Sequence, residues 1–284
     1  MAKVIDNVKN FVNTKILKKS HTRENIESSY VLETKNLGIT FGGLKAAQNV
    51  NLKIKKNQIY GLIGPNGAGK TTVFNLLTGV YQPTDGEFFL NGENLTGLPQ
   101  DKINHKGIAR TFQNIRLFNN MTVVRNVMVG LSNQPEYKCS LFESILRLPN
   151  HFRVEKEMRE RAKELLKIFG LEDERNNLAC NLPYGKQRKL EIARALATNP
   201  KLLLLDEPVS GLDPKVTMEM YKLIAELNER DGITVIMISH DIAAAVKYAS
   251  HILYIGKEIF FGTRDEYLKS DTAAKFDLLV GGDR

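Results

Sequence analysis

A glycine-rich segment in the first third of the chain has the residue types and spacing needed to hold phosphate groups. Residues 64–71 read Gly-Pro-Asn-Gly-Ala-Gly-Lys-Thr, and Thr72 follows. Glycines let such a loop curl until its backbone N–H groups point inward at phosphate oxygens. Lys70 adds a cation that can reach β- and γ-phosphates, and the hydroxyl of Thr71 suits Mg2+ coordination. A strand-to-helix turn that binds no nucleotide is the alternative. The predicted nucleotide contacts are Gly64, Pro65, Asn66, Gly67, Ala68, Gly69, Lys70, Thr71 and Thr72.

Two adjacent carboxylates follow a short, continuous apolar run. The run at 202–205 leads directly into Asp206 and Glu207. Ligands of open parallel sheets bind at the carboxyl ends of the strands. We therefore expect Asp206 to hold Mg2+ through water and Glu207 to orient or deprotonate an attacking water. The alternative is a pair of solvated acids at the end of a strand.

A histidine follows the next apolar run, at 234–238, after Ser239. His240 could contact a γ-phosphate and sense its loss, whereas a lone histidine is usually structural. We assign that structural role to His21, His105, His151 and His251. No group of His, Cys and acidic residues has the spacing of a zinc site.

The elements that must position these residues alternate between strand and helix patterns. Patterns typical of strands occupy 30–34, 38–41, 50–54 and 58–63. The phosphate loop then opens a helix at about residue 69, and residues 100–183 are mostly helical in pattern and rich in charge. The alternation predicts an α/β fold, with a parallel core sheet and a helical insertion between its first and later strands.

Composition narrows the class of protein without choosing a partner. The chain has 284 residues, of which 42% are hydrophobic and 25% charged, so disorder of the whole chain is excluded. No apolar run approaches the roughly 18 residues that a membrane span needs. Cys139 and Cys180 are the only cysteines, which favours a reducing compartment. The net charge of +8 favours nucleic acid, nucleotide phosphates or an anionic membrane face as a partner, with simple solubility as the alternative.

Residues 1–28 have a different pattern from the rest of the chain. Apolar residues recur at helical spacing between lysines, which would suit a basic amphipathic helix on a membrane or a partner. A frayed, partly helical extension is the alternative.

A further segment, at residues 182–188, makes the set of motifs resemble a known family. Residues 182–188 read Leu-Pro-Tyr-Gly-Lys-Gln-Arg, and the apolar helical pattern of 190–196 follows. This segment looks like the signature, typically Leu-Ser-Gly-Gly-Gln, of the ATP-binding cassette (ABC) family of transporter ATPases. The order of motifs also fits: phosphate loop, a glutamine at 113, signature, acidic strand, 210–213 and His240. The resemblance covers roughly residues 30–262.

The resemblance implies roles that spacing alone does not assign. Gln113 would contact Mg2+ and the attacking water, and Asp213 would lie in a loop that joins two ATP sites. Phe41 would stack on adenine, although a core strand residue is the alternative. The implied catalytic residues are Glu207, His240 and Gln113, the metal site is Thr71, Gln113 and Asp206, and the signature contacts to ATP are Tyr184, Gly185 and Lys186.

Two residues depart from the family signature. Pro183 replaces the serine, which removes a hydroxyl and an N–H. Tyr184 replaces the first glycine, while Gly185 and the start of the following helix remain. We therefore expect an anion-facing helix end to persist.

The resemblance also implies a fold and its boundaries. The fold that it implies is a P-loop NTPase (ABC cassette) of class α/β. This fold has a mostly parallel RecA-like core sheet, an N-terminal antiparallel β region and an inserted helical subdomain. The expected boundaries are an extension at 1–28 and a single nucleotide-binding domain at 29–284. Within that domain, the core would be 29–100 and 196–284 and the helical subdomain 101–195.

A narrower resemblance implies a function. Residues 110–118, 121–123 and 141–154, with the Tyr-Gly form of the signature, look like the ATP-binding subunits of branched-chain amino acid importers, a look that urea importers share. Such a subunit would hydrolyse ATP with Mg2+ at the cytoplasmic face of the cell membrane, as a peripheral protein. It would dimerise head to tail with itself or a paralogue and act indirectly with a solute-binding protein, with no nucleic acid expected. Transmembrane permease subunits would dock near Ile115, Leu117, Phe118 and Met121.

Three other functions stay open from the sequence. They are a lipopolysaccharide exporter of the same family, a soluble cassette ATPase that acts on nucleic acid or ribosomes, and a nucleotide-binding module without turnover. The presence of both Glu207 and His240 argues against the last.

Overall fold

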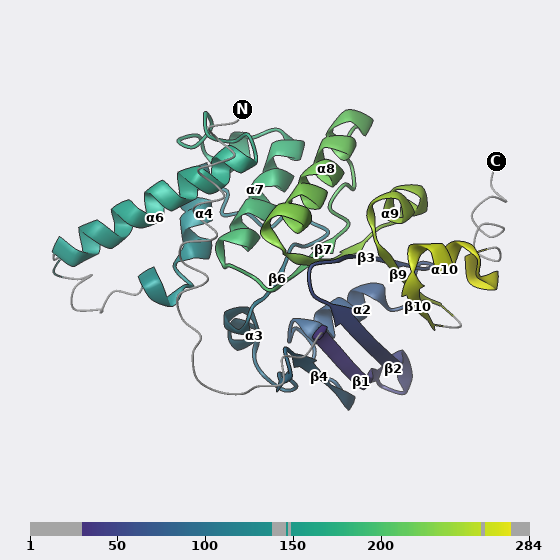
Figure 1. Ribbon diagram of the computed structural model, residues 1–284. Helices are drawn as coiled ribbons and strands as arrows, with labels where there is room; N and C mark the ends of the chain where they lie inside the picture. The colour runs from purple at the N-terminus through teal and green to yellow at the C-terminus, as the bar shows by residue number, and fades with distance from the viewer. Residues whose placement is uncertain (1–29, 138–145, 147–148, 257–258, 274–284) are drawn as a thin grey trace.

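The computed structural model describes residues 30–137, 146, 149–256 and 259–273. These residues form layers (Figure 1): a small antiparallel sheet, helix α2, a larger sheet, and a group of helices on its other face. The α/β class predicted from the sequence is confirmed.

The larger sheet has six strands in the order β10-β9-β3-β8-β7-β6. Neighbours from β6 to β9 pair in parallel, and β10 pairs with β9 in antiparallel orientation. Its strands are β3 (Ile59–Ile63), β6 (Ile108–Arg110), β7 (Leu202–Asp206), β8 (Thr234–Ile238), β9 (His251–Ile255) and β10 (Ile259–Thr263).

The central strands are buried on both faces, which explains their continuous apolar runs. All residues of β3, β7 and β8 are buried. Along β7, Leu202 and Leu204 face the core around α2. Leu203 and Leu205 face the core shared with the outer helices. The helix that follows the phosphate loop and the outer helices therefore cover opposite faces of one sheet.

The smaller sheet has the order β2-β1-β4-β5 and packs on α2 (Lys70–Leu77). Its strands are β1 (Tyr30–Phe41), β2 (Leu44–Lys55), β4 (Asp85–Leu90) and β5 (Glu93–Asn94). The sequence predicted two strands at 30–34 and 38–41, but β1 is continuous. Its pairing with β2 shifts register between Thr34 and Leu37, where Asn36 has a φ of 49°, and this irregularity interrupts the alternating pattern.

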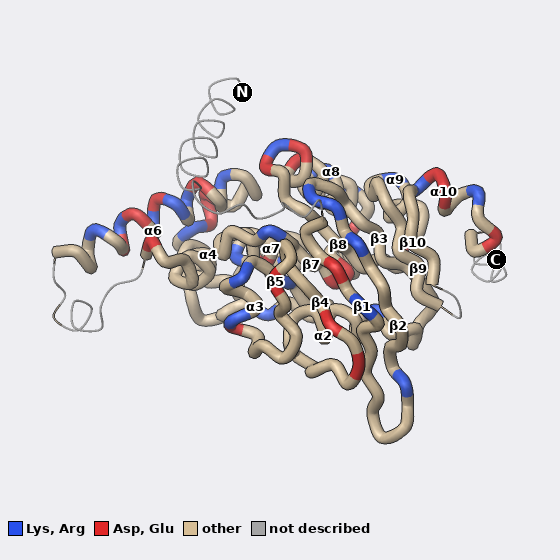
Figure 2. Tube along the Cα trace, turned by 60° about the horizontal axis from the view of Figure 1, so that its bottom comes forward, with Lys and Arg blue, Asp and Glu red and all other residues tan. Residues whose placement is uncertain are grey.

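The outer helices form a group beside the larger sheet (Figure 1). Helix α6 lies at one end and carries charges of both signs along its length (Figure 2). These outer helices are α4 (Val123–Leu131), α6 (Pro149–Ile168), α7 (Tyr184–Ala197), α8 (Pro214–Asp231), α9 (Ile242–Tyr248) and α10 (Arg264–Leu268). Helix α3 (Gln100–Lys106) lies on the other face, where Ile103 packs in the core around α2.

One part of the expected helical subdomain is wrong. Strand β6 lies inside 101–195, yet it pairs with β7 at the edge of the larger sheet. The backbone N–H groups of Lys201 and Leu202 donate hydrogen bonds to Gly107 O, and these bonds hold residues 108–110 alongside β7. The predicted extension at 1–28 and most of 141–148 lie outside the described residues. Within the described part of the chain, no helix is long and apolar enough to cross a membrane.

Candidate active site

The predicted phosphate loop connects the end of β3 to the start of α2. Gly64, Gly67 and Gly69 all have positive φ, at 147°, 78° and 93°. A Cβ atom at Gly64 would lie 2.0 Å from Ile255 O, and one at Gly69 would lie 2.5 Å from Ala46 O. Glycine is therefore required here by the backbone conformation and by the space available.

Lys70 lies inside this loop rather than in solvent. Its side chain is buried, and Nζ donates hydrogen bonds to Gly64 O at 2.7 Å and Pro65 O at 2.9 Å. Burial lowers the pKa of Lys70, and the negative charges of Glu207 and Asp206 oppose that shift. The cation and the two carboxylates thus share one site, as the sequence predicted.

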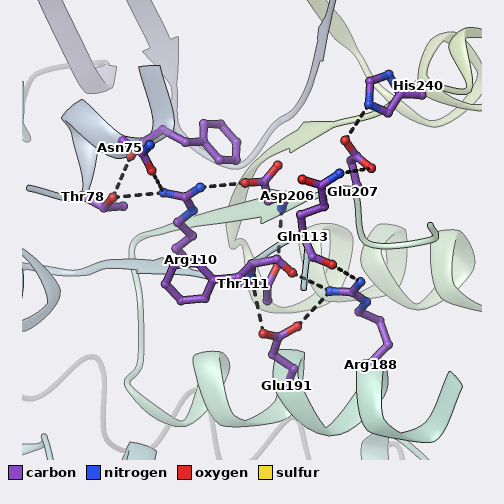
Figure 3. A network of polar contacts seen from close by, with 12 residues as sticks. Asn75, Thr78, Arg110, Thr111, Gln113, Arg188, Glu191, Asp206, Glu207 and His240 are labelled. Carbon is purple, nitrogen blue, oxygen red and sulfur yellow. Dashed lines mark hydrogen bonds and ion pairs between the residues drawn. The ribbon is translucent and has the colours of Figure 1, made fainter. Parts of the chain in front are cut away.

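Asp206, at the end of β7, is held by a partner that the sequence analysis missed. Its Oδ2 accepts a hydrogen bond from Nη2 of Arg110 at 2.6 Å, in an ion pair whose side chains are 6% and 2% exposed (Figure 3). Arg110 also donates to Oδ1 of Asn75 on α2 at 2.6 Å. The ion pair therefore joins β6, β7 and the helix that follows the phosphate loop.

The other oxygen of Asp206 is free to bind a ligand. Oδ1 is buried and has no hydrogen-bond partner in the structure. An unsatisfied buried acceptor is costly, and a carboxylate oxygen suits Mg2+ or a water bound to it. No group of three or more His, Cys, Asp and Glu side chains among the described residues could hold a metal ion. The donor set fits Mg2+, which commonly takes only one or two carboxylates and relies on phosphates and water for the rest.

Three residues predicted to be catalytic come together around Glu207 (Figure 3). Nε2 of Gln113 donates to Oε2 of Glu207 at 3.2 Å, and Nε2 of His240 lies 2.5 Å from Oε1. Glu207 itself has a φ of 51°, a conformation that residues other than glycine rarely adopt. Such strain persists where the surroundings fix the residue, and it is concentrated at functional sites.

Phe41 lies at the end of β1 and is exposed. Its ring is 44% exposed and meets the ring of Tyr81 edge to face, with centroids 5.1 Å apart. The alternative interpretation as a core strand residue is therefore wrong. An exposed aromatic face is what stacking on a base requires.

The remaining predicted ATP contacts lie at the starts of two helices. Helix α7 begins at Tyr184 after Pro183, and its start has no side-chain cap. The side chain of Lys186 is paired with Glu174. Asp213 caps α8, since its Oδ1 accepts from the backbone N–H groups of Lys215 and Val216.

The segment predicted to dock membrane subunits follows Gln113. Phe118 is 44% exposed and Met121 39% exposed, whereas Ile115 and Leu117 are half-buried. Only part of this segment therefore presents apolar side chains to the surface.

Comparison with known proteins agrees with this geometry. The sequence profile of the ABC transporter family matches residues 47–210. The high-affinity branched-chain amino acid transport ATP-binding protein LivG of Escherichia coli (strain K12) is 44% identical over 230 residues, which cover 81% of this chain and 89% of LivG. The corresponding protein BraF of Pseudomonas aeruginosa is 44% identical over 227 residues, 80% of this chain and 88% of BraF.

The chain is also similar to an ABC protein of a different transport system and to solved structures of ABC cassettes. The lipopolysaccharide export system ATP-binding protein LptB of Haemophilus influenzae is 32% identical over 87% of this chain and 97% of LptB. The ADP conformation of MJ1267, an ATP-binding cassette of an ABC transporter, superposes with a TM-score of 0.74 at 28% identity, over 88% of this chain and 98% of that one. The dimeric cassette MJ0796 bound to ADP and Pi gives a TM-score of 0.68 at 30% identity, over 81% and 98%.

Proposed function

Because this chain belongs to the ABC transporter family, we propose that it is the ATP-hydrolysing subunit of a membrane transporter that imports branched-chain amino acids. The single observation that carries hydrolysis is the grouping of Gln113 and His240 on the two carboxylate oxygens of Glu207. The 44% identity to LivG and BraF supports the choice of solute.

The phosphate loop and Lys70 bind the β- and γ-phosphates in this proposal. Lys70 exchanges its bonds to Gly64 O and Pro65 O for phosphate oxygens, and Phe41 stacks on adenine. Mg2+ would be held by the hydroxyl of Thr71, by Gln113 and by Oδ1 of Asp206, and it would neutralise charge that develops on the phosphates.

Glu207 acts as the general base. Oε1 is engaged by His240, so Oε2, which accepts from Gln113, is the oxygen that takes the proton from the attacking water. The bond from His240 fixes the carboxylate orientation, and the strained backbone of Glu207 keeps its side chain at the end of β7.

A complete site needs a second cassette. The start of α7, with Tyr184, Gly185 and Lys186, closes the ATP site of a second copy or a paralogue, and Asp213 lies where the two sites meet. Because Lys186 is paired with Glu174, we assign the anion contact to the helix end itself. Dimeric cassettes such as MJ0796 support this arrangement.

The domain boundaries and the location complete the proposal. We assign residues 29–284 to one nucleotide-binding domain; among the described residues, α3 packs with α2 and β6 pairs with β7, so both belong to the core, and the helical subdomain is the later part of 101–195. The chain works at the cytoplasmic face of the membrane, where permease subunits dock on Phe118 and Met121 and receive solute from a binding protein.

A lipopolysaccharide exporter is the second candidate, supported by the 32% identity to LptB.

Purification of the full chain from membranes tests this proposal. The expected result is a complex with permease subunits whose ATPase rate rises when a binding protein loaded with a branched-chain amino acid is added. The Glu207→Gln variant in the same complex is the control for contaminating ATPases. Stimulation by lipopolysaccharide would favour the second candidate, and recovery of ribosomes or DNA would overturn the transport function.

A further inference from the structure

Tyr184 occupies a position where the family signature has glycine, and the structure gives its side chain specific contacts. The side chain is 45% exposed, yet its hydroxyl oxygen accepts a hydrogen bond from Nη2 of Arg188 at 3.0 Å. Its ring lies beside the loop before α8, since a methyl group at Gly211 would be 3.4 Å from Cε1 of Tyr184. The tyrosine thus bonds to Arg188 on its own helix and lies beside the loop before α8, and a glycine has no side chain to do either.

Arg188 connects this hydroxyl to the segment that carries Gln113. The arginine is fully buried. Its Nη2 also donates to Gln113 O at 2.6 Å, and Nη1 donates to Phe112 O at 2.6 Å. A guanidinium NH2 group has two hydrogens, so Nη2 uses one for Tyr184 and one for Gln113. A movement of the tyrosine hydroxyl therefore acts on the same nitrogen that holds the backbone of Gln113.

Glu191 keeps Arg188 in place from one turn further along α7. Its Oε2 accepts from Nη1 of Arg188 at 3.1 Å, and Oε1 accepts from the backbone N–H groups of Phe112 and Arg116, at 3.4 and 3.2 Å. Figure 3 shows Arg188 and Glu191 on one helix, both directed at the segment that includes Thr111 and Gln113. Backbone donors and acceptors of residues 112–116 are thus fixed by one buried ion pair.

The other end of this chain of contacts is the proposed base. The side chain of Gln113 reaches Oε2 of Glu207, so a shift of its backbone changes the position of that amide against the carboxylate. We propose that Tyr184 is a positioning residue that links the start of α7, through Arg188 and the backbone of Gln113, to Glu207. The inference rests on the proposed function and adds to it, since it makes hydrolysis in one site depend on a residue that closes the other.

The hydrogen bond of the Tyr184 hydroxyl distinguishes a positioning role from direct binding of ATP. The Tyr184 hydroxyl oxygen accepts from a buried cation of its own chain, so we assign it to positioning within the chain rather than to contact with a nucleotide on a second copy. Removing only that oxygen should therefore alter turnover and leave the ATP-dependent association of two copies intact.

The Tyr184→Phe variant of the full chain tests the inference. A hydrogen bond to a charged group is lost while the ring stays, so kcat is expected to fall about fivefold, with KM for ATP within about twofold. In a Gln113→Ala background the same change is expected to have no further effect. In a Glu207→Gln background it is expected to leave the ATP-dependent dimer as stable as before. Tyr248→Phe on α9, which also removes one hydroxyl, is the matched control with unchanged kcat.

Three results with these variants would contradict the inference. An unchanged kcat would show that the hydroxyl positions nothing. Additive losses with Gln113→Ala would show that its effect does not pass through Gln113. A weakened dimer in the Glu207→Gln background would show direct contact with the nucleotide of the second copy. Absence of ATPase activity in the unmodified chain would instead overturn the proposed function.

Discussion

The phosphate loop and the start of α7 are both helix N-termini suited to anions, but they are built differently. The phosphate loop has three glycines at positive φ, a buried lysine and, beside it, an aspartate oxygen without a partner. At the start of α7 the polar side chains bind within the chain, Lys186 to Glu174 and Arg188 to Glu191. The first region leaves a carboxylate oxygen unpaired and bonds its lysine only to backbone carbonyls, whereas the second pairs its cations with carboxylates of its own chain.

This difference indicates how the two regions contribute. In the proposed function, groups of the first region contact phosphate and water, so substitutions there should remove binding or catalysis. The second region acts through the position of a helix end, so substitution of its partly exposed lysine should have a small effect, and substitution within its buried ion pair should lower stability.

The largest effect is expected at the end of β7. Glu207→Gln removes the general base, and kcat should fall about a hundredfold or more while ATP still binds. Steady-state ATPase assays together with nucleotide titration measure both quantities. Turnover at the rate of the unmodified chain would show that Glu207 is not the base.

The buried ion pair of α7 should matter mainly for stability. Glu191→Ala leaves the charge of Arg188 buried and unpaired, so the free energy of unfolding should fall by about 3 kcal/mol. Denaturant unfolding measures it. Glu219→Ala is the matched control, because its pair with Lys189 is on the surface and should contribute less than about 0.5 kcal/mol. Equal losses in the two variants would contradict the contrast between buried and exposed contacts.

A comparison of two lysines tests the contrast in ligand binding. Lys70→Ala removes the cation that reaches the phosphates, and ATP affinity should fall about thirtyfold, the weight of a hydrogen bond to a charged group. Isothermal titration with ATP and Mg2+ measures it, with Lys222→Ala on the exposed face of α8 as control for the loss of one positive charge. An affinity unchanged from the unmodified chain would contradict the assignment of the loop.

The smallest effect is expected for the lysine of α7. Lys186→Gln restores the family residue and breaks a partly exposed pair with Glu174, so ATP-dependent association of the Glu207→Gln variant should change less than about threefold. Sedimentation at several protein concentrations measures that association. A tenfold loss would show that the Lys186 side chain itself binds ATP.

The sequence predicted the parts of the site that depend on short spacing. The loop at 64–71 and the acids after the run at 202–205 are recognisable because their chemistry follows directly from neighbouring residues. His240 was a candidate because it follows the apolar run at 234–238, and the resemblance to a family added Gln113; the structure brings both side chains to Glu207.

The contacts between distant segments were not predictable in this way. Arg110 and Asp206 are separated by 96 positions, and Arg188 and Phe112 by 76. No local sequence pattern indicates such pairs, because each arginine resembles any other charged residue in the sequence. Only the folded sheet and α7 bring the paired segments together. Strand β6 was missed for a related reason, since three residues between helical patterns form a strand only when β7 lies alongside.

In the proposed dimer, the phosphate loop of one copy and the start of α7 of another close around the same ATP. The most direct measurement is the mass of the Glu207→Gln variant in solution, determined by sedimentation with Mg2+ and either ATP or ADP. Twice the mass of the single chain is expected with ATP, and the mass of the single chain is expected with ADP. A variant that binds ATP and keeps the mass of the single chain at every concentration would contradict it.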